Sequence, residues 1–522
     1  MEQTSNVMRL AKPKRKGIMG LVFSRLMIIV ILILLQILLF LSVFHWFRQF
    51  LPHYALFQFA FTIVMTVYLF NNTMDSAAKL TWLALIAIVP LPGTFLLFYT
   101  RTNFGHRALQ KRVKELIDKT KNAVPQDDAV LKALDGDAYG TDDLRRYANR
   151  SGCFPIFGNT GVKYFPLGED MFAAMLEELE KAEKYIFMEY FIIEEGYMWG
   201  RILDILARKA KAGVDVRVMY DGTCEIATLP HDYPNRLEAI GIKARTFSPV
   251  TPFISTHYNY RDHRKILVID GETAFNGGVN LADEYINQKE VYGHWKDTAV
   301  MLRGDAVTGF TLMFLQMWNI TEQTPDFSLC AKPAVSVKDA AGFVMPYADC
   351  PLDEDKVGES VYMDILYRAT DYVHIMTPYL ILDGELETAL KYAAQRGVDV
   401  KLILPGVPDK KFAYALAKSH YRSLISAGVK IYEYTPGFVH AKVFVSDDRR
   451  AVVGTINLDY RSLYHHFECA TFLYKTSCIG EIETDFEETL LKCREVTPVT
   501  IQNEKLYYKL TGSLMKIVAP LM

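Results

Sequence analysis

The first hundred residues contain three long apolar runs. Residues 26–44 form one run interrupted only by Gln36 and Ser42, residues 54–70 form a shorter one, and residues 80–99 form a third that contains Pro90. About 20 apolar residues in a helix span a hydrocarbon core of ~30 Å, and membrane helices tolerate proline better than soluble helices do. The pattern predicts an N-terminal membrane anchor over residues 1–122 with two or three transmembrane segments.

The orientation of this anchor is left open by its charges. Basic residues are abundant before residue 26 and after residue 100, and sparse between the runs. The positive-inside rule would place both flanks in the cytoplasm, which three full spans cannot do, so either one run is re-entrant or the N-terminus faces outward. A cleaved signal peptide is the alternative for the first run, but the run is too long for that and two more follow it.

Charge separates the chain into two parts. Residues 1–122 hold 15 Lys and Arg against four Asp and Glu, a balance of +11, whereas the remaining 400 residues carry −13. The segment 105–121 predicts a basic helix, either lying on the lipid surface or simply solvated. All seven cysteines follow the anchor, odd in number and without a paired pattern, which favours reduced thiols on a cytosolic face.

Beyond the anchor, the hydrophobic pattern occurs twice. A strand-like run at 185–193 precedes a helical stretch at 199–212 and a second apolar run after Gly213; the same order recurs at 372–381, at 386–396 and after Gly397. Strand, helix and strand with glycine at the helix exit indicate a βαβ unit with parallel strands. We therefore expect an α/β fold of two similar halves, at residues 123–335 and 336–522.

Each half then carries the same motif, H-x-K-x4-D-x6-G-[GT]-x-N, without a gap between the copies. The first copy contributes His263, Lys265, Asp270 and Asn280, and the second His440, Lys442, Asp447 and Asn457. Both run along predicted strands, where side chains alternate between faces, so histidine and lysine share a face. The aspartates have the opposite parity and are expected to brace the motif, although they belong to the predicted catalytic set.

Two histidines, two lysines and two asparagines that meet between the halves are suited to a phosphate ester. Lysine ammonium groups and asparagine amides favour the charge of the phosphoryl transition state. An imidazole with a pKa near ~6.5 can act as nucleophile when neutral and as acid when protonated. This predicts attack by one histidine, protonation of the leaving alkoxide by the other, and a phosphohistidine intermediate. The alternative is that His263 and His440 are structural histidines on buried strands, and the duplication disfavours it.

The duplicated motif resembles that of the phospholipase D superfamily and, more narrowly, of the bacterial cardiolipin synthases, over essentially the whole chain. The resemblance implies two phospholipase D-like α/β halves around a pseudo-twofold active site, no metal and no cofactor. It also implies a carboxylate downstream of each motif that orients the histidine of that motif, which would be Asp297 for His263 and Glu468 for His440. Gly278 and Thr455 stand where the superfamily often has serine, and little consequence is expected.

The resemblance implies transfer of a phosphatidyl group between two phosphatidylglycerol molecules at the cell membrane, giving cardiolipin and glycerol. The enzyme would be a multi-pass membrane protein with its catalytic body on the cytoplasmic face. Hydrolysis, or transfer to another alcohol, would use the same groups. A membrane-anchored nuclease is less favoured, because a body of charge −13 does not suit the phosphate backbone of a nucleic acid. The superfamily more often assigns the nucleophile to the first copy, here His263. The sequence leaves the acceptor, the acyl preference and the oligomeric state open.

Overall fold

The computed structural model describes most of the chain beyond the first apolar run. It covers residues 7–11, 34, 37–39, 41, 42, 45, 54–72, 74–101, 107–135, 140–152, 154–249, 260–330, 337 and 340–521. Most of the predicted span 26–44 lies outside these residues, and its described positions are helical and exposed.

The predicted anchor contains short helices. Helix α3 (Tyr54–Phe70) coincides with the second apolar run, and the third is divided into α4 (Ser76–Ile88) and α5 (Pro90–Arg101). The division falls at Pro90, which has no amide hydrogen to continue the first helix. Among the described residues, none of the helices has both the length and the apolar character needed to cross a bilayer. The predicted transmembrane helices are therefore not confirmed.

The predicted basic helix exists as α6 (Arg107–Thr120), and its apolar side faces the body. Val113 and Leu116 are buried, and the Arg112 guanidinium donates to the carbonyl oxygens of Asn319 and Ile320 at 3.2 and 3.3 Å. The helix is thus packed against the protein along one side, which neither sequence interpretation anticipated. Helices α7 (Asp128–Leu134) and α8 (Thr141–Gly152) lead from it to the first sheet.

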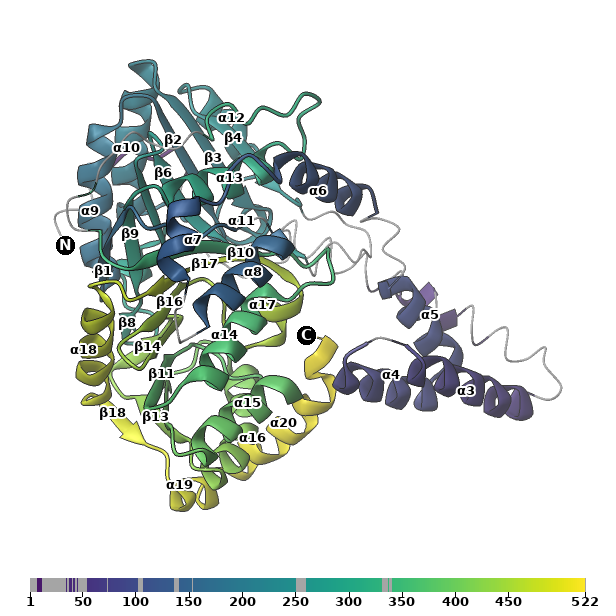
Figure 1. The fold of residues 1–522 in the computed structure, drawn as a ribbon. Coiled ribbons are helices and arrows are strands. Elements are labelled where there is room, and N and C mark those ends of the chain that lie inside the picture. Colours follow the sequence, from purple (N-terminus) through teal and green to yellow (C-terminus); the bar gives the residue numbers. More distant parts are fainter. Residues whose placement is uncertain are drawn as a thin grey trace.

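The first half is built on a seven-stranded sheet in the order β1-β9-β7-β6-β2-β3-β4 (Figure 1). Its strands are β1 (Thr160–Phe165), β2 (Tyr185–Tyr190), β3 (Asp215–Asp221), β4 (Lys243–Phe247), β6 (Lys265–Ile269), β7 (Thr273–Gly277) and β9 (Ala299–Gly304). Its helices are α9 (Gly168–Lys181), α10 (Tyr197–Lys211), α11 (Thr223–Ala227), α12 (Tyr233–Glu238), η3 (Asp283–Ile286) and α13 (Val307–Trp318).

The second half repeats this order in the sheet β10-β17-β16-β15-β11-β12-β13, with β18 added at the edge. Its strands are β10 (Phe343–Asp349), β11 (Tyr372–Met376), β12 (Asp399–Pro405), β13 (Lys430–Tyr434), β15 (Val443–Ser446), β16 (Arg450–Gly454), β17 (His466–Tyr474) and β18 (Cys493–Glu495). Its helices are α14 (Val357–Arg368), α15 (Gly384–Gln395), α16 (Lys411–Ser426), α17 (Tyr460–Tyr464), α18 (Ile479–Leu490), α19 (Pro498–Gln502), α20 (Leu506–Val518) and η4 (Ala519–Leu521).

The predicted βαβ units are confirmed in both halves. Strand β2 pairs with β3 in parallel, as β11 does with β12. The glycines at the helix exits, Gly213 and Gly397, have φ of 97° and 96°, a left-handed conformation that favours glycine. The motif strands β6 and β15 lie antiparallel beside β2 and β11, so each sheet is mixed and each motif lies at its centre.

Two short strand pairs join the halves. Strand β5 (Arg261–Asp262) pairs with the start of β17, and β14 (Gly437–Val439) pairs with β8 (His294–Lys296). These two pairs occupy equivalent places, because β5 and β14 each end directly before a motif histidine. The predicted division at 335/336 lies outside the described residues, at a place in the sequence between α13 and β10.

Candidate active site

The two strand pairs between the halves bring each motif histidine to the other half. The His263 amide donates to the Phe467 carbonyl at 2.9 Å, and the His440 amide donates to the Lys296 carbonyl at 2.7 Å. Phe467 directly precedes Glu468, and Lys296 directly precedes Asp297. The backbone therefore places each histidine beside the carboxylate of the opposite half.

The histidine–carboxylate pairs are consequently crossed. His263 Nδ1 lies 2.9 Å from both carboxylate oxygens of Glu468, and His440 Nδ1 lies 2.7 Å from Asp297 Oδ2. The expectation that each carboxylate serves the histidine of its own motif was wrong, because the strands that carry them pair between the halves. In both pairs the Nδ1–H group donates a hydrogen bond to the carboxylate, which leaves Nε2 as the nitrogen with a free lone pair in the neutral ring.

The motif lysines hold the backbone of their own histidines. The Lys265 ammonium donates to the His263 carbonyl at 2.7 Å, and that of Lys442 donates to the His440 carbonyl. Lys442 Nζ also lies 2.9 Å from His440 Nδ1. Because Nδ1–H donates to Asp297, this nitrogen cannot also accept a hydrogen bond from the lysine. Both ammonium groups are buried, and burial lowers the pKa of Lys265 to about 8 and that of Lys442 to about 7.

The two crossed pairs differ electrostatically. Burial, followed by Lys442, lowers the pKa of His440 to about 4. Burial, followed by Lys265, lowers the pKa of His263 well below its ordinary value. Burial also raises the pKa of Glu468, whereas in Asp297 the effect of burial is outweighed by His440 and Lys442, which lower its pKa. His440 therefore faces an anion that can stabilise imidazolium, whereas burial disfavours the charged form of His263.

The motif aspartates lie at the far ends of the motif strands and do not face the histidines. Asp270 accepts hydrogen bonds from the backbone amides of residues 183–185, and Asp447 accepts them from those of residues 370–372. Each aspartate thus fixes the beginning of the neighbouring strand, β2 or β11. These contacts agree with the predicted bracing role, and the place of Asp270 and Asp447 in the catalytic set stays a prediction.

The two predicted phosphate-binding asparagines have different surroundings. The Asn280 amide donates to the Tyr285 hydroxyl at 2.8 Å, and its oxygen accepts from the Ile192 amide at 3.1 Å. Asn457 is buried, and its Oδ1 has no hydrogen-bond partner among the described residues. Asn457 therefore has an unused acceptor oxygen, and the phosphate-binding role of both amide groups stays a prediction.

The residues in place of serine contact the orienting carboxylates. The Thr455 hydroxyl donates to Glu468 and anchors it. At Gly278 a Cβ would lie 2.0 Å from Asp297 Oδ1, so a larger residue would displace that carboxylate. The expectation of little consequence stays untested, but each position now has a physical reason for its residue.

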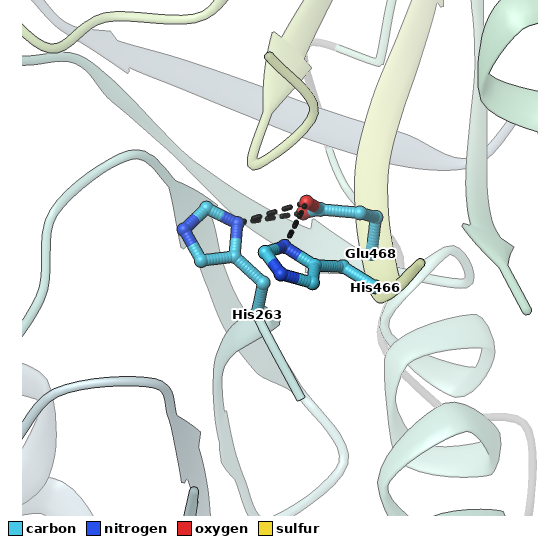
Figure 2. A group of neighbouring side chains, drawn as sticks. All are labelled: His263, His466 and Glu468. Atoms are coloured by element: carbon cyan, nitrogen blue, oxygen red, sulfur yellow. Dashed lines mark hydrogen bonds and ion pairs between the residues drawn. The ribbon is translucent and has the colours of Figure 1, made fainter. Parts of the chain in front are cut away.

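His466 is a site residue that the sequence analysis left without a role. Figure 2 shows it beside His263, with Nδ1 3.5 Å from Glu468 Oε1, and the two imidazole rings lie 5.3 Å apart. Both of its ring nitrogens are buried without a hydrogen-bond partner in the described part of the chain. The signal for it was its position two residues before Glu468, which puts both side chains on one face of β17.

His263, His466 and Glu468 are close enough to share a metal ion, since their ligand atoms lie within 4.8 Å of one another. However, the Lys265 ammonium adjoins His263 and lowers its pKa, and that of Lys442 does so as well. Two cations at this position oppose the binding of a dication. We therefore infer that Glu468 and His466 orient the His263 imidazole and do not bind a metal ion with it.

Comparisons with known proteins agree on one family. The domain described as "Cardiolipin synthase, PLD-like domain" matches residues 175–318 and 362–490. A cardiolipin synthase of Alkalihalophilus pseudofirmus is 33% identical over 88% of this chain and 92% of its own length. An uncharacterised protein of Streptococcus mutans is 57% identical over 87% of this chain and 99% of its own.

The fold is also similar to that of a solved structure. The phosphatidylserine synthase of Haemophilus influenzae aligns with a TM-score of 0.56 and 16% sequence identity, over 73% of this chain and 97% of that protein.

Proposed function

The chain belongs to the cardiolipin synthase family and is a phosphatidyltransferase of the phospholipase D superfamily, and we propose that it makes cardiolipin from two molecules of phosphatidylglycerol. The crossed pairs are the observation that carries this proposal. They supply two imidazoles with fixed tautomers and two lysine cations, which suits a phosphodiester that must be attacked and whose leaving group must be protonated.

In the first step, the Nε2 lone pair of His263 attacks phosphorus. The bond between phosphorus and the glycerol headgroup oxygen breaks, and the Nε2 proton of His440 passes to that oxygen, so that glycerol leaves. The product is a phosphatidyl group bound covalently to His263. In the second step, His440 Nε2 takes the proton of a hydroxyl on the second phosphatidylglycerol, whose oxygen attacks phosphorus and releases His263.

The electrostatic difference between the pairs supports this division of roles. Burial and the nearby Lys265 strongly lower the pKa of His263, which favours a neutral nucleophile. His440 faces Asp297, whose pKa is lowered, and an anion at that position stabilises imidazolium. A bound phosphodiester adds a further negative charge and raises the pKa of His440 when it has to act as an acid.

We further propose that the enzyme works at the cell membrane, with the catalytic body on its cytoplasmic face. Its substrates would be membrane lipids, and nucleic acid would not be a partner. The helices α3, α4 and α5 support this location, because large apolar side chains remain exposed on them, among them Leu56, Phe59, Phe70, Leu80 and Ile88. Such a surface is unfavourable in water and suits contact with lipid.

The first test is a lipid mass spectrum after the purified full-length protein has been incubated with phosphatidylglycerol in mixed micelles. We expect cardiolipin and an equal amount of glycerol from the wild type, and none from His263→Ala or His440→Ala, because the two residues act as one unit. Phosphatidic acid without cardiolipin would make the protein a hydrolase, and substantial activity in either variant would overturn the two-histidine mechanism.

A synthetic phosphatidyl ester of p-nitrophenol tests the separate roles. This leaving group departs without protonation, so His440→Ala should still release one burst of p-nitrophenol and accumulate phosphatidyl-enzyme. His263→Ala should release none. A burst from His263→Ala and none from His440→Ala would make His440 the nucleophile and His263 the acid, with the same overall reaction.

A further inference from the structure

The C-terminal helix α20 exposes an apolar stripe. Leu506, Tyr507, Leu510, Leu514, Ile517 and Val518 are between 40% and 69% exposed. At 100° per residue these six positions fall within about one third of the helix circumference. Isolated apolar side chains on a surface are ordinary, but a continuous stripe of this kind marks an interaction site.

The opposite side of α20 is fixed to the protein, so the stripe cannot turn inward. Gly512 is buried against α16, where an added Cβ would lie 2.4 Å from the Ala415 carbonyl oxygen. Met515 packs into a small cluster with Leu416 and Ala519. The helix therefore has one face committed to the body and one face that is apolar and without a protein partner in the described part of the chain.

Two observations indicate a lipid surface as the occupant of this face. The Thr81 hydroxyl of α4 donates to the Ile517 carbonyl at 2.6 Å, and Figure 1 shows the C-terminal end of the chain beside α4. Helix α20 therefore adjoins a helix that also exposes large apolar side chains. Helix α20 contains no acidic residue, and exposed Lys509 and Lys516, with Lys505 at its start, lie beside the stripe. Apolar side chains flanked by lysines are typical of helices that lie in the interface of anionic membranes.

We propose that α20 lies in the interfacial region of an anionic phospholipid bilayer, with its apolar stripe among the acyl chains. This rests on the proposed function, for which it supplies the docking surface. The same cluster that holds Met515 and Ala519 includes Tyr460 of α17. Tyr460 lies three residues after Asn457, and α17 leads into the strand that carries Glu468. Helix α20 would thus hold the catalytic site directly against its lipid substrate.

The test measures the depth of single positions in the membrane. Full-length protein is reconstituted into vesicles of phosphatidylglycerol and phosphatidylcholine, with an environment-sensitive fluorophore on Leu510→Cys or Leu514→Cys. Gln502→Cys, exposed on the neighbouring α19, is the matched control, and the parent chain gives the background from native cysteines. We expect lipids with quenchers in their acyl chains to quench positions 510 and 514 but not position 502.

A functional arm separates docking from chemistry. Leu510→Glu combined with Leu514→Glu should lower phosphatidylglycerol turnover in vesicles about tenfold. The substitutions remove apolar area from the stripe and add negative charge that anionic lipids repel, and both changes weaken membrane binding. Turnover in detergent micelles should stay unchanged, which also shows that the variant is folded. Gln502→Glu combined with Asn503→Glu adds the same charge away from the stripe and should have little effect.

Equal quenching at positions 502, 510 and 514 would overturn the proposal, even if cardiolipin is made normally. A fluorophore at position 510 or 514 that is shielded from water but not quenched by the lipids would also overturn the proposal, since that outcome indicates that a second copy of the chain covers the stripe. Selective quenching without any lipid turnover would support the docking surface and contradict the proposed function.

Discussion

At the residue scale, the crossed pairs make each half dependent on the other. His263 is held by a carboxylate 205 residues away, and His440 by one 143 residues away. A half on its own would have a histidine without its orienting group. The covalent step therefore requires both copies of the motif, even though only one imidazole becomes phosphatidylated in the proposed mechanism.

The crossing predicts which step each carboxylate serves. Asp297→Asn and Glu468→Gln should each lower cardiolipin synthesis by about a hundredfold or more, because an amide does not stabilise imidazolium and permits the wrong tautomer. With the p-nitrophenol ester, Asp297→Asn should retain the burst, since it acts through His440, whereas Glu468→Gln should slow it. Stopped-flow absorbance measures both. A burst lost only in Asp297→Asn would restore the uncrossed assignment.

The buried histidines predict a loss of stability in acid. The pKa of His440 is about 4 in the folded protein and about 6.5 in an unfolded chain, so the unfolded state binds more protons between these values. Stability is therefore retained above pH 6.5 and falls as the pH decreases toward 4, by about 2 kcal/mol for this residue between pH 7 and pH 5. Thermal unfolding in detergent should show that His440→Asn reduces this decrease.

The control for that prediction is Gln502→Asn, an exposed substitution on α19 that removes no titratable group. It should leave the difference in melting temperature between pH 7 and pH 5 as in the wild type. An unchanged difference in His440→Asn would mean that this histidine titrates in the folded protein much as it does in the unfolded chain.

At the element scale, the motif aspartates join neighbouring strands. Asp447 has a left-handed φ of 53° and accepts three backbone hydrogen bonds where β11 begins. Asp447→Ala should lower the free energy of unfolding by about 3 kcal/mol, since hydrogen bonds to a charged group are worth about 1.5–3 kcal/mol each and water replaces part of them. Denaturant titration measures this loss.

Activity per folded molecule should be preserved in Asp447→Ala below its melting temperature. Asp447→Asn, which tolerates the same φ and keeps one acceptor oxygen, should lose less stability. A large fall in the turnover number of properly folded Asp447→Ala would instead give this aspartate a direct part in the reaction.

The repeated elements could be predicted from the sequence because their signals are local. The local signals are the apolar runs within 265–269 and 443–446, the glycines after α10 and α15, and the motif spacing. The crossing could not be predicted in this way, because it depends on the pairings β5–β17 and β14–β8, in which only two or three residues of each strand pair across a large separation in sequence. His466 was missed for a related reason, since its importance comes from contact with His263 and not from the motif.

At the scale of the whole molecule, the short segment of residues 7–11 is attached to the catalytic body. The Leu10 and Ala11 amides donate to Glu195 Oε1 at 3.1 and 3.2 Å, and the Arg236 guanidinium donates to the Leu10 carbonyl at 2.6 Å. The Tyr233 hydroxyl donates to the same oxygen of Glu195 at 2.7 Å. A segment that precedes every predicted span is therefore docked on a domain that follows all of them.

This attachment predicts that the chain crosses the membrane an even number of times, because residues 7–11 and the body must then lie on the same side. The two-span or re-entrant arrangement is thereby favoured over three full spans. Single cysteines at Arg9 and Glu290, both exposed, should react with a membrane-impermeant maleimide from the same side of sealed vesicles. The parent chain, labelled intact and after detergent, controls for native cysteines and for leakage. Labelling of the two positions from opposite sides would mean an odd number of crossings and would show that the N-terminal segment does not dock on its own body in the membrane.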